Sequence, residues 1–540
     1  MTGVQTCALP ICTAAAPPPC QGGEASIAGA WGGARRTTAN AFLAGLDGDY
    51  ARESVPRIVA ALDRYADDWV VIQRASCMAH QRGEVSSAAF DRRTACLARR
   101  KAALTAVADV ATSATVSSLP DLVIASSGLP DLATCDDDDA LLSPVAPPTA
   151  AEAPEAAAIA DLIAKVDVER DAARTEQATR DAESAVARAE ALGYQPLVAR
   201  ALLARGRIAL SLRTSDRGAA DFDEATRTAM EAGDERLAIE SFARSAFAIA
   251  TTVGPADALA GLPLIESITR RLGDRAAFER ALLHHNAGVV DMARGDRAAA
   301  RTAFTRALAE SQSLSGAARI EMTVALSNLA LVATDEAERT RVGDELIAVN
   351  TRLLGPNHPA TIAARILLAG LTMDPPAAYR ALAAPCRTMA ALHPTQVGWI
   401  AECSYELLLL ALAMADATTM RLAVDQIAAT GDHGGDADYL RRAAGVRAML
   451  DGQPLEAART LDTLHVTVAP GTPWFVVSLN VDLDLLAAAA RLGAGQARAA
   501  SLQLDGAGQQ LDAVAAQMPP SVLASRRFTL AALRARASRP

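Results

Sequence analysis

Aromatic residues are scarce in this chain of 540 residues, at 4% of the composition, although 51% of the residues are hydrophobic. Alanine, leucine and valine must therefore fill the interior. Such side chains favour close-packed helices, whereas strands are enriched in aromatic and β-branched residues. Lysine is nearly absent as well, with only Lys101 and Lys165, which indicates a high-GC coding bias. The composition predicts an all-α protein.

Long apolar runs and an excess of positive charge are also lacking. The most apolar stretch, Leu407 to Met414, is bounded by Glu406 and Asp416, and it falls short of the roughly 20 residues that a membrane-spanning helix needs. The formal net charge is −10, which argues against nucleic acid as a partner. We expect no membrane span and no nucleic-acid binding in this chain.

Sequence motifs of enzymes are missing. No G-x-S-x-G, H-E-x-x-H, P-loop or G-x-G-x-x-G pattern occurs in the chain. His284 and His285 are the only adjacent histidines, and two ligands on one helix without a third make a poor metal site. We therefore expect no catalytic residues, no cofactor and no metal.

The chain is too long for a single core, and its composition divides it into four parts. Residues 1–23 form a Pro/Ala-rich segment, 24–135 a helical bundle, 136–155 an acidic Pro/Ala-rich linker and 156–540 a helical repeat array. The first 11 residues resemble translated adapter sequence, so we expect the native chain to continue upstream. Within the bundle, helices are expected over about 24–46, 51–81 and, with Ser86 or Ser87 as the N-cap, to about 116.

Six cysteines are candidates for disulfides. Cys77 and Cys96 lie about 9 and 13 Å from the turn of a predicted helical hairpin, and Cys20 and Cys135 flank the bundle. We expect pairs Cys77–Cys96 and Cys20–Cys135; four buried free thiols are the alternative. Cys386 and Cys403 flank a turn near His393-Pro394, where a third disulfide and two buried thiols fit equally well.

The segment Leu282 to Leu308 shows how the array is built. It reads LLHHNAGVVDMARGDRAAARTAFTRAL, two short helices separated by a turn at Arg294-Gly295-Asp296. Small residues at Gly288, Ala300 and Ala307 permit the close approach of two helices, and Phe304 lies one helical turn after Ala300. The pattern resembles a tetratricopeptide repeat (TPR), which implies an α-solenoid that binds other proteins.

Glycines at positions 193, 233 and 273 are spaced by 40 residues in similar contexts, and turns at Gly316 and Gly355 continue this period less regularly. We expect each of them where the chain reverses. The loop LLGPNHPAT, residues 353–361, resembles the inter-repeat loop of kinesin-light-chain-like TPR proteins. After Pro470, the final helices with Arg534, Arg536 and Arg539 are expected to cap the solenoid.

Binding residues are expected on the first helices of the repeats, which line the concave groove. Asn286 and Asn328 fall near positions that contact peptide backbones in resembling repeats, and His285 lies beside them. Arg205 and Arg207 would add charge-assisted contacts to an acidic partner. The alternative is that the asparagines cap or pack locally.

A second resemblance covers residues 41 to 100. The helix with Tyr65 and Trp69, Cys77, the tripeptide Arg82-Gly83-Glu84 and the segment 92–100 with Cys96 resemble a region of many bacterial serine/threonine protein kinases. There this region lies between the membrane helix and a TPR array. The kinase domain itself has no counterpart here, since the Gly-rich loop, HRD and DFG motifs are lacking.

The resemblance implies a non-catalytic sensory or regulatory region that binds protein or peptide in a concave groove. Disulfides would place it on the extracytoplasmic, periplasmic side of the bacterial inner membrane, tethered through a missing upstream segment. The alternative is a free-standing cytoplasmic TPR adaptor or chaperone-like scaffold.

Overall fold

The structure, a computed structural model, describes residues 20–137, 141, 145–212, 215–252, 254–431, 437–468, 472 and 474–539. Within these ranges every regular element is helical and no strand occurs, which confirms the all-α class. The first 11 residues, most of the expected 1–23 segment, and Asp138 and Asp139 of the acidic linker lie outside the described residues.

Five helices form the N-terminal bundle, together with the short turns Val116–Ser118 and Ala133–Cys135. They are α1 (Gly23–Trp31), α2 (Gly33–Ala44), α3 (Asp49–Gln81), α4 (Ser87–Ala111) and α5 (Leu119–Ser127). The single helix expected over 24–46 is broken at Gly32 and Gly33, because Gly33 adopts a positive φ of 41°. Ser86 caps α4 as expected, with its side chain accepting from the backbone N–H of Ala89.

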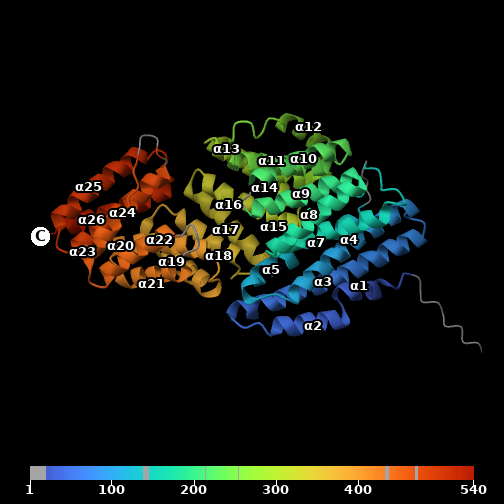
Figure 1. Ribbon diagram of the computed structural model, residues 1–540, viewed down its shortest axis with the longest axis horizontal. Helices are drawn as coiled ribbons and strands as arrows, with labels where there is room; N and C mark the ends of the chain where they lie inside the picture. Colours follow the sequence, from blue (N-terminus) through green and yellow to red (C-terminus); the bar gives the residue numbers. More distant parts are fainter. Residues whose placement is uncertain are drawn as a thin grey trace, which may run out of the picture.

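The remaining helices form an α-solenoid in which consecutive helices pack in antiparallel pairs (Figure 1). The first part contains α7 (Ala153–Asp171), α8 (Thr175–Leu192), α9 (Gln195–Ser211), α10 (Ser215–Glu231), α11 (Glu235–Thr252), α12 (Leu262–Leu272), α13 (Ala277–Ala293) and α14 (Arg297–Ser311). It continues with α15 (Gly316–Glu321), α16 (Thr323–Val332), α17 (Glu336–Leu353), α18 (Pro359–Gly370) and α19 (Pro375–Leu392). The second part contains α20 (Val397–Met414), α21 (Ala417–Thr430), α22 (Ala437–Leu450), α23 (Pro454–Asp462), α24 (Trp474–Gly493), α25 (Ala497–Val514) and α26 (Pro520–Ala537). We call α7, α9, α11 and α13 the first helices of their pairs.

The periodic glycines lie where the chain reverses, as predicted. Gly193, Gly233 and Gly273 have φ values of 75°, 75° and 58°. Gly193 ends α8 in the left-handed conformation that closes many helices. Gly316 and Gly355 also have positive φ. The 40-residue period of the sequence therefore equals the length of one helix pair with its turns.

A second set of glycines lets the paired helices approach closely. A Cβ atom on Gly206 would lie 2.6 Å from the ring of Phe222, and one on Gly288 would lie 2.6 Å from the ring of Phe304. In both pairs the aromatic residue follows the glycine by 16 residues. Phe222 and Phe304 are fully buried, so each ring fills the space that the missing side chain leaves on the facing helix.

The bundle is not separate from the array. Its hydrophobic core includes Val168 and Ala172 at the end of α7, and Leu354 after α17. The loop 353–361 contacts the bundle as well: Asn357 donates to Glu53 at 2.7 Å, and His358 Nε2 lies 3.1 Å from the carbonyl oxygen of Pro120. Figure 1 shows the bundle lying along α7 and near α15, with the C-terminal helices at the far end of the molecule.

The disulfides differ from the predicted pairing in the bundle. The structure joins Cys20 to Cys77 and Cys96 to Cys135, with Cα–Cα distances of 5.6 and 5.5 Å, so the expected pairs Cys77–Cys96 and Cys20–Cys135 are wrong. Equal height along a hairpin does not fix the face on which a side chain lies. α1 packs on α3, which brings Cys20 to Cys77, and the chain after α5 returns to Cys96 of α4.

The third disulfide joins Cys386 of α19 to Cys403 of α20 across the expected turn, with a Cα–Cα distance of 5.8 Å. α20 is the one described helix that is long and apolar enough to cross a membrane, and 61% of it is buried inside the structure. Residues Leu407 to Leu412 belong to the core, as expected for a buried helix.

The last helix, α26, folds back on α20, α24 and α25. Arg526 donates to Asp482 at 2.9 Å and also pairs with Glu406 of α20. Arg526 and Asp482 are both buried, and a buried guanidinium needs such partners. The helix thus covers the end of the array.

We predict that Gly288→Ala lowers the free energy of unfolding by about 1–3 kcal/mol, because the new methyl group overlaps the ring of Phe304. Thermal and urea denaturation measure the change. Gly506→Ala in α25 is the control, since a Cβ there meets nothing within 4 Å; it should stabilise by up to about 1 kcal/mol. Equal effects of the two substitutions would contradict the close-approach interpretation.

Candidate functional site

Three adjoining cavities lie along the line where the bundle meets the first helices. The largest, of about 500 Å³, lies over α9 and α11; a second, of about 320 Å³, lies beside α15; the third, of about 270 Å³, lies between α4, α7 and α9. Arg207 lines all three. This is the arginine that the sequence singled out for the inner surface of the repeats.

A chain of alternating charges runs through these cavities. Asp167 of α7 lies 3.5 Å from Arg170 and 3.1 Å from Arg207 of α9. Glu321 of α15 lies 2.8 Å from Arg244 of α11 and 4.0 Å from Arg207. Three consecutive first helices and the short helix α15 are therefore joined by one ion-pair network.

The network sets the charge of Glu321. Burial alone would raise the pKa of this carboxyl, but Arg244, Arg207 and Arg170 outweigh it and lower the pKa to about 2. Burial would lower the pKa of Arg244, yet Glu321 and Glu240 raise it. Glu321 and Arg244 thus hold each other in the charged form at neutral pH, whereas burial lowers the pKa of Arg207.

The smallest of the three cavities carries an excess of positive charge, and we call it the arginine cavity. The charged residues that line it are Arg99, Arg100, Arg170, Arg200, Arg207, Asp167 and Asp171. The bundle helix α4 contributes two of these arginines, and the array contributes the others. The cavity therefore exists only because the bundle packs on the array.

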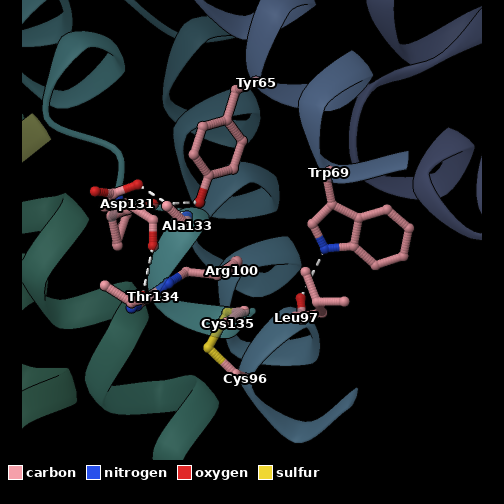
Figure 2. The surroundings of a disulfide bond; sticks show 10 residues. Tyr65, Trp69, Cys96, Leu97, Arg100, Asp131, Ala133, Thr134 and Cys135 are labelled. Carbon is pink, nitrogen blue, oxygen red and sulfur yellow. Dashed lines mark hydrogen bonds between the residues drawn. A yellow bond between two sulfur atoms is a disulfide. The ribbon is translucent and has the colours of Figure 1, made fainter. Parts of the chain in front are cut away.

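The disulfide Cys96–Cys135 fixes the bundle wall of this cavity (Figure 2). Cys96 lies one helical turn before Arg100, whose guanidinium donates to the hydroxyl of Thr134 at 3.1 Å. Tyr65 of α3 donates to the carbonyl oxygen of Pro130 at 2.8 Å. The chain from Pro130 to Cys135 is thereby held against α4, which positions Arg100 at the cavity.

The structure brings together three of the predicted binding residues. His285 Nδ1 lies 2.9 Å from Asn286 Oδ1, and its Nε2 lies 3.0 Å from Asn328 Nδ2. Burial lowers the pKa of His285, so the neutral ring donates at Nδ1 and accepts at Nε2. Asn286 also donates to the carbonyl oxygen of Ala243 at 2.8 Å.

This network joins α11, α13 and α16 from within, and His285 and Asn286 are buried. The alternative stated above, that the asparagines pack locally, accounts for these contacts. Contact of Asn286, Asn328 or His285 with a ligand stays a prediction.

Arg205 and Arg207 differ in their surroundings, although both lie on α9. Arg205 makes two hydrogen bonds to Asp221 of α10, at 2.9 and 2.6 Å, and so holds its own helix pair together. Arg207 lines the cavities. In a helix, residues two positions apart face away from each other, and this explains the separate surroundings.

Sequence reasoning missed most of the cavity residues. A spacing of 37 residues, close to the repeat period, separates Arg170, Arg207 and Arg244. This regular spacing of arginines on otherwise apolar first helices could have predicted that they line a common surface. Glu321 and the two arginines of α4 gave no such signal, because their place depends on how the bundle folds back. Among the described residues, no group of three His, Cys, Asp or Glu side chains could hold a metal ion.

Neither the protein-family models nor the curated proteins with which the chain was compared match it. The site must therefore be interpreted from its own geometry.

We predict that Glu321→Gln destabilises the protein by about 2–3 kcal/mol, because it leaves Arg244 and Arg207 with less opposing charge. A carboxyl whose pKa falls from about 4.5 to about 2 on folding stabilises the fold above pH 4.5. That contribution is lost as the pH falls from 4.5 towards 2.

Urea denaturation between pH 7 and 3 measures both effects. The wild type should lose stability over this range more steeply than the variant. Glu224→Gln is the control, since its pair with Arg227 is exposed on both sides and should contribute less than about 1 kcal/mol. Parallel pH profiles of wild type and Glu321→Gln would refute the role of the network.

Proposed function

We propose that the chain is a non-catalytic binding region, the sensory or regulatory part of a bacterial serine/threonine protein kinase. The observation that carries the proposal is the α-solenoid whose first helices present an arginine-lined surface to the N-terminal bundle. The TPR assignment is supported by the 40-residue period and by the shared spacing of Gly206 with Phe222 and of Gly288 with Phe304.

The position of the bundle supports a regulatory role. In the resembling kinases this region follows the membrane helix, so the bundle stands between the upstream part of the chain and the array. A ligand that binds between bundle and array would change how firmly the two are held together. That change would reach the kinase through the bundle and bias its clustering or activity.

A protein or peptide ligand is the proposed partner, and acidic groups suit the site best. The three cavities are lined by arginines from several helices, and guanidinium groups recognise carboxylates and phosphates through paired hydrogen bonds. The carboxylates of the network are matched with arginines, which favours binding over acid–base catalysis.

The cysteines support the proposed extracytoplasmic location. Three disulfides, Cys20–Cys77, Cys96–Cys135 and Cys386–Cys403, persist in oxidising compartments and are rare in the cytosol. Two of them fix the bundle, and one joins α19 to α20 in the array. The proposed location is the periplasmic face of the inner membrane.

Recovery of the uninterrupted reading frame tests the connection to a kinase. A kinase domain with HRD and DFG motifs, followed by an apolar span of about 20 residues, is expected upstream. An intact frame that has neither would leave the kinase proposal without support and favour the free-standing adaptor.

We predict that the protein isolated from an oxidising compartment shows no reactive thiol at the six paired cysteines. Titration of the unfolded protein with a thiol reagent, with and without reductant, counts them. Peptide mapping without reduction should recover the links Cys20–Cys77, Cys96–Cys135 and Cys386–Cys403. Free Cys77 and Cys96 in native protein would instead point to the cytoplasmic adaptor.

A further inference from the structure

The arginine cavity lacks enough negative charge for its arginines. Its two carboxylates, Asp167 and Asp171, are already engaged: Asp171 lies 2.6 Å from Arg170, and Asp167 lies 3.1 Å from Arg207. Arg200 reaches outward to Asp234, at 3.1 Å. Arg99 and Arg100, which α4 contributes to the cavity, have no carboxylate at ion-pair distance among the described residues.

Arg99 and Arg100 are exceptional in this respect. Arg100 donates to the hydroxyl of Thr134, a neutral acceptor. Arg99 makes no hydrogen bond or ion pair within the part of the chain that the structure describes; Asp161 acts on it only at longer range. Burial, with Arg200 and Arg100 nearby, lowers the pKa of Arg99 to about 10. Arg200 and Arg100 thus place more positive charge near this side chain than Asp161 offsets.

Two unused donors belong to side chains that line the same cavity. The Nε atoms of Arg100 and Arg207 are buried, and neither has a hydrogen-bond partner among the described residues. Buried donors are almost always satisfied in native proteins, by protein atoms, water or a ligand. Arg100 belongs to the bundle and Arg207 to the array, so one acceptor group between them would serve both sides.

We infer that the arginine cavity binds a small oxyanion, the phosphate or carboxylate group of a small molecule, between α4 of the bundle and α9 of the array. A volume of about 270 Å³ suits a compact anion, since drug-sized ligands occupy about 300–1,000 Å³. The two neighbouring cavities give room for the rest of the molecule. The bound anion would draw the bundle and the array together.

The inferred anion is a different ligand from the proposed protein or peptide partner. Its binding is tested independently of the connection to a kinase, so the failure of one proposal does not imply the failure of the other. An acidic side chain of a peptide offers the same oxyanion chemistry. The cavity is only partly open, however, and its volume of about 270 Å³ favours a free small molecule over a chain segment.

Calorimetric titration of the full chain tests the inference with three probes: inorganic phosphate, citrate and a hexapeptide of glutamate. Sodium chloride at matched ionic strength serves as the reference, because phosphate also stabilises proteins without binding. We expect saturable binding of phosphate or citrate. The double variant Arg99→Gln/Arg100→Gln should bind roughly tenfold to a hundredfold more weakly. Arg52→Gln should bind as the wild type does, since Arg52 is an exposed arginine of α3.

The melting temperature in chloride alone separates a binding role from a structural one. Arg99→Gln removes a charge that no ion pair offsets, so it should raise the melting temperature of the ligand-free protein and abolish the further rise that the anion causes in the wild type. A fall of the ligand-free melting temperature would assign Arg99 to the fold. Absence of saturable anion binding, equal binding by the double variant, or binding of the peptide alone would overturn the inference.

Discussion

Packing of α4 and α5 against α7 and α15 is the constraint on which the rest of this structure depends. It makes the core of the bundle continuous with that of the array, through Val168, Ala172 and Leu354. It also forms one wall of the cavities, since an array alone would present α7 and α9 to solvent. Charged residues that would be exposed on an open solenoid are buried here, and they must therefore be paired or find a ligand.

The helices themselves could be predicted from the sequence, because their signals are local. The glycine at 193 ends a helix by its own backbone conformation, and Gly288 meets Phe304 across a turn of a few residues. Ser86 caps the helix that it precedes. Each of these features is decided by residues close together in the chain. The turn at Gly193 and the cap at Ser86 were predicted and are confirmed, and the contact of Gly288 with Phe304 shows how the two helices approach closely.

The disulfide pairing and the cavities could not be predicted, because they depend on contacts between distant segments. Cys77 and Cys96 stand at similar heights in a hairpin, but their partners come from α1 and from the chain after α5. Glu321 reaches Arg244 only because α15 lies against the bundle and the first helices. Among the predicted binding residues, Arg207 lines the cavities while Asn286 is engaged inside the array; sequence position alone does not distinguish the two.

The chain's own helices cover the surface that an array of this kind offers to partners. α4 and α5 lie on the first part of the solenoid, and α26 lies on α20 and α24 in the second part. An extended peptide along the whole array would have to displace both. Binding at the edges, or in the cavities between bundle and array, requires no such displacement. A ligand between bundle and array would contact both parts. Its binding free energy would therefore add to the contacts that hold the two parts together, and movement of the bundle away from the array would weaken ligand binding.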